Sequence, residues 1–183
     1  MQQWLIRRFL RRVTELAATA GPGRILDAGC GEGFVLRHLA PRLTARHRFA
    51  GVDASTAALG EARARDTDAA LLRGDIHRLP FGGGSFELVI ATEVLEHLEE
   101  PERALEELRR VSRRFVLLSV PREPFFAGLN LMRGKNLRRL GSDEGHRQHW
   151  TRDGFLRFVR RRLTVVAAPQ GAFPWTLVLT EVW

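Results

Sequence analysis

The stretch that decides the fold is residues 25–33, which read Ile25-Leu26-Asp27-Ala28-Gly29-Cys30-Gly31-Glu32-Gly33. The apolar run that enters it predicts a buried strand over residues 24–29, and the pattern that follows it predicts a helix over residues 34–42. Gly29 and Gly31 permit backbone angles that other residues avoid, and they let a ligand approach the main chain. The start of the following helix offers N–H groups that lack intrahelical partners. We therefore expect a ligand site at this turn.

Outward from this turn, strands and helices alternate along the chain. Further strands are expected at residues 47–53, 69–73, 86–91, 115–120, 163–168 and 175–182. Further helices are expected at residues 1–20, from Ser55 to about residue 66, from Pro101 to about residue 113, and from Thr151 to about residue 162. This alternation indicates βαβ units and an α/β fold with a doubly wound, mostly parallel sheet. The last two strands are joined by residues 169–174, too few for a helical crossover, so they are expected to form an antiparallel hairpin.

Length and composition set the class of protein. The chain has 183 residues, of which 44% are hydrophobic and 27% charged, which favours a single globular domain over residues 1–183. The one cysteine, Cys30, excludes an intramolecular disulfide and a cysteine-rich metal site. The N-terminus lacks the features of a signal peptide, and no stretch approaches the roughly 20 apolar residues that cross a bilayer. These features predict a cytoplasmic protein.

The net charge of +8 leaves several partners open. A basic protein can attract nucleic acid, anionic lipid or an acidic small molecule. The charge can equally reflect a general preference for arginine, which greatly outnumbers lysine in this chain. Charge alone therefore does not identify a partner.

Asp53 points to the kind of cofactor. It ends the second expected strand, where a carboxylate can accept hydrogen bonds from a ribose diol. A glycine turn followed by an acidic residue about 20 positions later also describes a dinucleotide site, but that fingerprint needs a third glycine where this chain has Phe34. The spacing therefore favours a nucleoside with a small zwitterionic tail. The alternative is a plain turn between a strand and a helix.

Four segments in order resemble the motifs of class I S-adenosylmethionine-dependent methyltransferases. Residues 25–33 resemble the first motif, residues 51–55 the second, and residues 74–76 with 79–81 the third. Residues 86–90, leading into 93–98, resemble the fourth region of the small-molecule branch, which includes ubiquinone- and menaquinone-type methylases. The resemblance covers about residues 23–121. It implies an enzyme with a seven-stranded, Rossmann-like methyltransferase fold and with S-adenosyl-L-methionine as its cofactor.

The resemblance also implies a division of roles among the cofactor-binding residues. Asp27 would reach the amino group of the methionine portion, and Ala91 would offer its carbonyl to the same ammonium. Asp53 would hold the ribose hydroxyls, Asp75 would accept from the adenine amino group, and the Ile76 N–H would donate to the ring. The complete implied set is Asp27, Gly29, Cys30, Gly31, Gly33, Asp53, Ala54, Asp75, Ile76 and Ala91. The Cys30 side chain is expected to pack in the interior rather than to act as a nucleophile.

Three histidines are candidates for a general base. Methyl transfer from a sulfonium is a direct displacement, so the protein must mainly align the acceptor and, for some acceptors, remove a proton. His97, His146 and His149 fall near the expected acceptor side, and their ordinary pKa lies near neutrality. The alternatives are that His97 caps its short helix and that the other two are solvated loop residues. The remaining three, His38, His47 and His77, are expected on the surface.

No metal site is expected from the sequence. Metal-dependent O-methylation would use a carboxylate cluster beside the acceptor. Asp143 and Glu144 alone are too few to form such a cluster. The sequence therefore predicts a reaction without a metal ion.

The region of residues 122–150 is expected to be a lid-like insertion over the carboxyl edge of the sheet. Its apolar residues followed by cations suit an amphiphilic acceptor with an acidic end, or a substrate at a membrane surface. The alternative is a lid whose charges simply face water. The basic helix at residues 1–20 could likewise lie on an anionic membrane, or it could pack near the cofactor cleft.

Taken together, these features predict methyl transfer to a small-molecule or lipid-like acceptor by a monomer or weak homodimer. One alternative is an RNA or other nucleic-acid methyltransferase, which the basic charge suggests. Against it, residues 91–94 lack the Asn/Asp-Pro-Pro-aromatic motif that family members use on amide and base nitrogens. A second alternative is a regulatory module that binds S-adenosylmethionine without catalysis.

Overall fold

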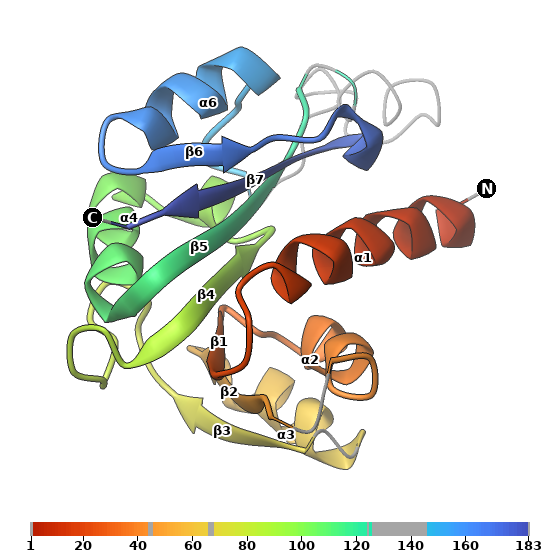
Figure 1. Ribbon diagram of the computed structural model, residues 1–183, viewed down its shortest axis with the longest axis vertical. Coiled ribbons are helices and arrows are strands. Elements are labelled where there is room, and N and C mark those ends of the chain that lie inside the picture. The colour runs from red at the N-terminus through yellow and green to blue at the C-terminus, as the bar shows by residue number, and fades with distance from the viewer. Residues whose placement is uncertain (1, 44–45, 66–67, 124, 126–145, 183) are drawn as a thin grey trace.

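The computed structural model describes residues 2–43, 46–65, 68–123, 125 and 146–182. At its centre is a seven-stranded sheet in the order β3-β2-β1-β4-β5-β7-β6 (Figure 1). The strands are β1 (Arg24–Ala28), β2 (Arg48–Asp53), β3 (Ala69–Arg73), β4 (Phe86–Thr92), β5 (Ser112–Pro121), β6 (Thr164–Ala167) and β7 (Trp175–Glu181). The helices are α1 (Gln2–Ala18), α2 (Phe34–Leu39), α3 (Thr56–Ala64), α4 (Pro101–Val111) and α6 (Arg152–Arg160), with short 3₁₀ helices η1 (Leu95–His97) and η3 (Gln170–Ala172).

The pairing directions confirm the expected fold class. Strands β3, β2, β1, β4 and β5 are parallel to one another, whereas β7 runs antiparallel to both β5 and β6. The strand order reverses at β1, which pairs with β2 on one side and with β4 on the other. Ligands of open α/β sheets bind at the carboxyl ends of the strands beside such a switch point. The glycine turn that follows β1 lies at that place.

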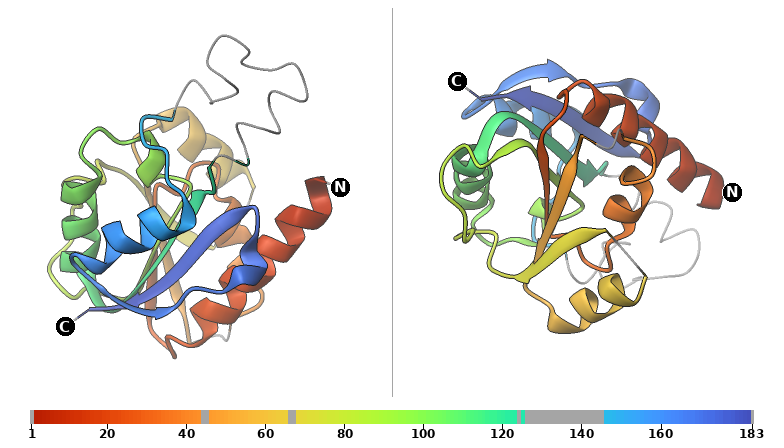
Figure 2. Two further views of the ribbon diagram at one scale, coloured as in Figure 1. Left: turned by 90° about the horizontal axis from the view of Figure 1, so that it is seen from above. Right: turned by 60° about the horizontal axis from the view of Figure 1, so that its bottom comes forward.

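Helices cover both faces of the sheet (Figure 2). Helices α1, α2 and α3 pack on one face, and α4 and α6 pack on the other. Helix α1 buries one stripe of side chains against the sheet, namely Phe9, Leu10, Val13 and Ala17. Helix α1 therefore packs on the sheet through this stripe. Among the residues that the structure describes, no helix is both long and apolar enough to cross a bilayer.

Local capping signals fix the starts of three helices where the sequence places them. The Ser55 hydroxyl accepts a hydrogen bond from the Ala58 N–H at 3.2 Å, and the Thr151 hydroxyl accepts one from the Gly154 N–H at 3.2 Å. Each bond satisfies one of the free N–H groups of a first turn. Pro101 is the first residue of α4, where its missing N–H costs nothing.

Strand β5 differs from the expectation at its start. It begins at Ser112, directly after α4, rather than at residue 115. Ser112 pairs with Phe86, and the register then shifts before Leu88 pairs with Phe115. Arg113 and Arg114 are exposed in this irregular stretch, so their charges do not interrupt the strand. A pattern based on apolar residues alone therefore places the start of β5 too late.

The expected lid lies largely outside the described residues. Of residues 122–150, the structure describes 122, 123, 125 and 146–150. Asp143 and Glu144, together with most of the apolar and basic residues of the insertion, fall in the part that is not described. The lid stays a prediction.

Candidate functional site

The glycine turn between β1 and α2 has the backbone geometry that the sequence indicates. Gly29, Gly31 and Gly33 have φ angles of +80°, +51° and +73°. The N–H groups of Gly29 and Cys30 both donate to the Val52 carbonyl, at 2.7 and 3.0 Å, which ties the turn to the end of β2. Nothing lies within 4 Å of the point where a Cβ on Gly31 would sit. The turn therefore presents open main chain at the carboxyl edge of the sheet.

Asp53 connects β2 to this turn. One oxygen, Oδ2, accepts from the Gly31 N–H at 2.8 Å, and the other, Oδ1, accepts from the Ser55 N–H at 2.8 Å. An ionised carboxylate has about four acceptor positions, so each oxygen retains capacity for a hydroxyl. The carboxylate is therefore oriented by the backbone and still able to bind a diol.

Asp27 is a buried carboxyl group that lacks a partner. It is 1% exposed, and neither carboxylate oxygen has a hydrogen-bond partner among the residues that the structure describes. Burial, reinforced by the negative charge of Asp53, raises the pKa of Asp27 from 3.8 to about 7. A buried polar group without a partner is costly. A cationic group bound at the tip of β1 would remove that cost.

Asp75 follows β3 and is held by a histidine. Its Oδ1 accepts from the His77 N–H at 2.9 Å, and His77 Nδ1 lies 2.8 Å from the same oxygen. Both contacts lower the pKa of Asp75, and the hydrogen bond from the His77 backbone N–H has the larger effect. The expectation that His77 is an isolated surface residue is therefore wrong, because it orients the carboxylate expected to bind adenine.

The other implied cofactor residues lie around the same edge. The Cys30 side chain packs with Leu36 and Leu59. Its pKa is raised to about 12, mainly by burial and further by the negative charges of Asp27 and Asp53. The thiol therefore packs in the interior, and only the Cys30 main chain is left to line the turn. Ala91 is buried in β4 opposite Leu118. The Ile76 side chain is buried in the core, whereas Ala54 is exposed after β2.

Sequence reasoning missed the role of Glu93, which joins three strands. Its Oε1 accepts from the Ser119 hydroxyl of β5 at 2.8 Å, and its Oε2 accepts from Trp175 Nε1 of β7 at 2.8 Å. Glu93 has a φ of +58°, an uncommon backbone conformation for a residue other than glycine. Burial raises its pKa to about 7, although the two hydrogen bonds act in the opposite direction. The sequence shows Glu93 only as part of the fourth motif.

Glu96 was also missed. It lies in η1 and is 1% exposed, and no described residue is a hydrogen-bond partner of its carboxylate oxygens. Burial, followed by the charge of Glu93, raises its pKa to about 9. The available signal was its place between apolar residues, Leu95 and Leu98, because a glutamate in such a position is often enclosed when the segment folds onto a sheet.

The structure brings the three candidate histidines together. The N–H groups of Arg147 and Gln148 donate to the Glu96 carbonyl at 2.7 and 2.9 Å, which ties their segment to η1. As a result, the ring centroids of His97 and His146 are 5.0 Å apart, and those of His146 and His149 are 6.4 Å apart.

Carboxylates complete two overlapping clusters around His146. Potential ligating atoms of Glu96, His97 and His146 lie within 4.8 Å of one another, and the same holds for Glu123, His146 and His149. The sequence separates these residues widely, so spacing along the chain could not reveal them.

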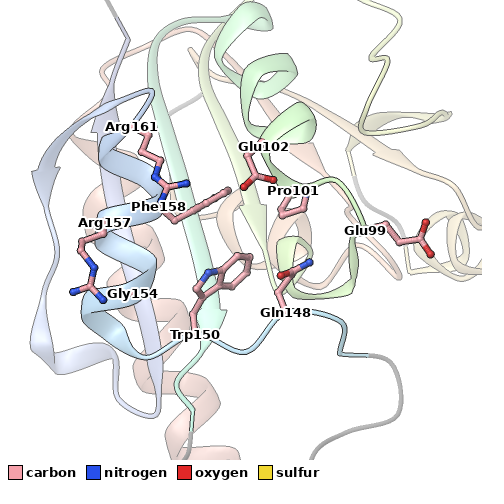
Figure 3. Close-up of a pocket in the computed structure, with 9 residues that line it drawn as sticks. All are labelled: Glu99, Pro101, Glu102, Gln148, Trp150, Gly154, Arg157, Phe158 and Arg161. Atoms are coloured by element: carbon pink, nitrogen blue, oxygen red, sulfur yellow. The ribbon is translucent and has the colours of Figure 1, made fainter.

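A separate hollow lies between α4 and α6 (Figure 3). It has a volume of about 330 Å³, and its lining includes Trp150, Glu102 and Arg157. The Trp150 ring packs on Phe158, with centroids 5.2 Å apart. None of the expected cofactor residues lines this hollow, so it is distinct from the site at the glycine turn.

Comparison with known proteins agrees with the fold and identifies a family. Residues 26–118 match the model of a family described as "Methyltransferase domain". The chain is 33% identical over 107 residues to a demethylmenaquinone methyltransferase of Thermotoga maritima, covering 58% of this chain and 46% of that protein. It is 37% identical over 93 residues to a malonyl-[acyl-carrier protein] O-methyltransferase of Legionella pneumophila, covering 49% of this chain and 32% of that protein.

A solved structure shares the whole architecture. Magnesium protoporphyrin IX methyltransferase from Synechocystis, with bound SAH, superimposes with a TM-score of 0.72 at 19% identity, covering 95% of this chain and 82% of that chain. This likeness establishes the shared fold. The chain spans less than half the length of the two curated relatives that it matches.

Proposed function

The chain belongs to the methyltransferase-domain family, and from that premise we propose that it transfers a methyl group from S-adenosylmethionine to a small-molecule or lipid-like acceptor. Its fold and its glycine turn are those of a S-adenosylmethionine-dependent methyltransferase. The proposal includes the class of acceptor, the role of each residue and the activity of the whole protein.

The observation that carries the proposal is the buried, unpartnered carboxyl group of Asp27. The methionine portion of the cofactor ends in an ammonium, which is the kind of group that such a carboxylate accepts. Because Asp27 leads directly into the glycine turn, an ammonium at its oxygens would lie close to the open main chain at Gly31. The residues present therefore fit this cofactor.

The rest of the cofactor has partners along the same edge. Asp53 would accept hydrogen bonds from the ribose hydroxyls. Its oxygens retain acceptor positions that the Gly31 and Ser55 N–H groups do not use. Asp75, oriented by His77, would accept from the adenine amino group. The Ala91 carbonyl and the Ile76 N–H would complete the contacts with the ammonium and the ring.

The cofactor supplies a methyl group on a sulfonium, which is already a good leaving group. The protein then needs to align the acceptor, exclude water and receive a proton where the acceptor carries one. His97, His146 and His149 are the candidate bases, since their rings gather at the carboxyl edge of the sheet. Among them, no single histidine is singled out by its contacts.

An acceptor with an acidic end is supported by Arg122, which follows β5. Within the described part of the chain its Nε and Nη2 are buried without hydrogen-bond partners, and its guanidinium lies 5.4 Å from the ring centre of Phe173. Burial and the nearby Arg152 lower the pKa of Arg122. An anionic partner would stabilise this guanidinium, because it would accept hydrogen bonds from the buried nitrogens. The acceptors named for the two curated relatives, demethylmenaquinone and malonyl-[acyl-carrier protein], fit a lipid-like or acidic acceptor.

The remaining parts of the proposal concern the whole molecule. Contact with a membrane surface would involve the start of α1, where Trp4, Arg7 and Arg11 are exposed, because the apolar stripe of this helix is already buried. A cytoplasmic location, a monomer or weak homodimer, and a single domain over residues 1–183 stay predictions.

Calorimetric titration with S-adenosylmethionine and with its product S-adenosylhomocysteine (SAH) tests the cofactor. We expect binding of one equivalent, and a loss of affinity in Asp27→Asn that a control such as Glu61→Gln on exposed α3 does not share. Absence of binding at high ligand concentration would overturn the proposal. Transfer of label from methyl-labelled cofactor to lipid and small-acid fractions then tests the acceptor, and transfer to RNA instead would replace it by the nucleic-acid alternative.

A further inference from the structure

We propose that Glu96, His97 and His146 form a binding site for a divalent transition-metal ion. One potential ligating atom from each side chain lies within 4.8 Å of the others. A carboxylate with two imidazoles is a donor set typical of zinc and of non-haem iron(II). The site goes beyond methyl transfer, and its existence does not depend on the cofactor.

The main chain holds the two halves of this site together. Glu96 and His97 lie in η1, just beyond the carboxyl end of β4. The Glu96 carbonyl accepts from both N–H groups that follow His146, at 2.7 and 2.9 Å, and the Gln148 side chain donates to the Leu98 carbonyl at 3.1 Å. Residues about 50 positions apart are thus fixed beside each other by backbone contacts. The ligands need only small side-chain movements to reach a common ion.

The arrangement of the imidazole rings matches a shared ion. A zinc–nitrogen bond of about 2.1 Å places each ring centre roughly 3.2 Å from the metal, so two imidazoles at a tetrahedral angle have centres about 5 Å apart. The ring centroids of His97 and His146 are 5.0 Å apart, with an angle of 64° between the ring planes.

The Glu96 side chain supplies an independent indication of a ligand. It is 1% exposed, and the structure gives neither of its oxygens a hydrogen-bond partner. Buried carboxyl groups are normally paired, hydrogen-bonded or bound to a metal. A cation at this position would satisfy both oxygens.

His146 also belongs to the second cluster, with Glu123 and His149. We assign the ion to the first cluster because Glu96 is the carboxylate that lacks hydrogen bonds. Ligation there would remove His97 and His146 from the candidate bases, and it would leave His149 as the histidine able to accept a proton from the acceptor.

The test is calorimetric titration of the chelator-treated full chain with Zn²⁺, supported by the visible absorption of the Co²⁺ form. We expect one equivalent to bind, and His97→Ala, His146→Ala and Glu96→Gln each to weaken binding by at least about tenfold. His38→Ala on α2, on the other face of the sheet, is the matched control and should bind as the parent does.

The variants are also titrated with SAH in the presence of chelator. Retained SAH binding shows, independently of the metal, that the variant is folded and that its cofactor site is intact. Retained SAH binding with lost Zn²⁺ binding supports the metal site. Parent protein that binds SAH but no equivalent of Zn²⁺ overturns it, as does unchanged Zn²⁺ affinity in His146→Ala. Loss of affinity in His149→Ala and Glu123→Gln but not in Glu96→Gln would also overturn it, because the ion would then occupy the second cluster.

Discussion

The carboxylate of Asp53 closes the glycine turn by accepting a 2.8 Å hydrogen bond from the main-chain N–H of Gly31. The bond links the carboxyl ends of β1 and β2, and it leaves the same carboxylate able to accept from a ribose diol. The structure of the turn and the proposed binding of the ribose are therefore coupled at Asp53.

Replacement of Asp53 tests this coupling. Asp53→Asn keeps one oxygen that can accept from Gly31, but it loses the charge and half of the acceptor positions. Since a hydrogen bond to a charged group contributes about 1.5–3 kcal/mol, SAH affinity should fall about 10- to 100-fold. Calorimetry measures the change, with Asp68→Asn, just before β3, as the control. Equal affinity in Asp53→Asn and the parent would contradict the assignment.

Alanine at Gly29 is expected to destabilise the protein more than alanine at Gly31. Both positions have positive φ, which costs alanine about 1–2 kcal/mol. At Gly29 the added Cβ would also lie 2.4 Å from Val94 Cγ2, whereas at Gly31 it meets nothing within 4 Å. Overlap in a packed region adds about 1–3 kcal/mol. Urea unfolding of both variants compares the costs, and Val94→Ala should recover part of the loss only in Gly29→Ala.

The free energy of unfolding is expected to fall as the pH rises from about 4 to about 7. Asp27 has a pKa of about 7 in the folded protein against 3.8 when unperturbed, so the folded state binds more protons in this range. Its contribution is complete below the unfolded pKa and is lost as the pH passes through the folded pKa. Asp27→Asn should flatten this part of the profile and be more stable than the parent at about pH 8. An identical profile in the variant would contradict the shift.

SAH affinity is expected to change with pH in the opposite direction. The ammonium of the ligand pairs with the ionised form of Asp27, which is the minor form below about pH 7. Affinity should therefore rise by up to about tenfold per pH unit between about pH 5 and 7, with release of a proton. Calorimetry in buffers of different ionisation enthalpy measures that proton. A pH-independent affinity would show that Asp27 does not bind the ammonium.

Trp175→Phe is expected to weaken the junction of β4, β5 and β7. Phenylalanine keeps most of the ring contact with Phe9, whose centroid lies 4.9 Å away, but it removes the N–H that donates to Glu93. Loss of a hydrogen bond to an enclosed carboxylate costs about 1–3 kcal/mol. Thermal and urea unfolding report the loss, and Trp4→Phe at an exposed position should change stability by less than about 0.5 kcal/mol.

Much of the fold, and the glycine turn of the proposed cofactor site, could be predicted because the signals are local. The glycine turn, Asp27 and the start of α2 lie within a few residues, so the strand-to-helix geometry follows from the sequence itself. The caps at Ser55 and Thr151 likewise act on N–H groups three residues away. The short connection of residues 169–174 was enough to predict the antiparallel end of the sheet.

Only the tertiary structure determines which residues meet on the proposed acceptor side of the sheet. Glu96, His97 and His146 meet because η1 and the segment before α6 are joined by backbone hydrogen bonds, and no spacing along the chain encodes that contact. The pKa values of Asp27, Glu93 and Glu96 depend on how completely the fold removes water from each carboxyl group. Hydrogen bonds between residues close in sequence can be predicted from the sequence. Desolvation and contacts between distant segments arise only when the chain is packed.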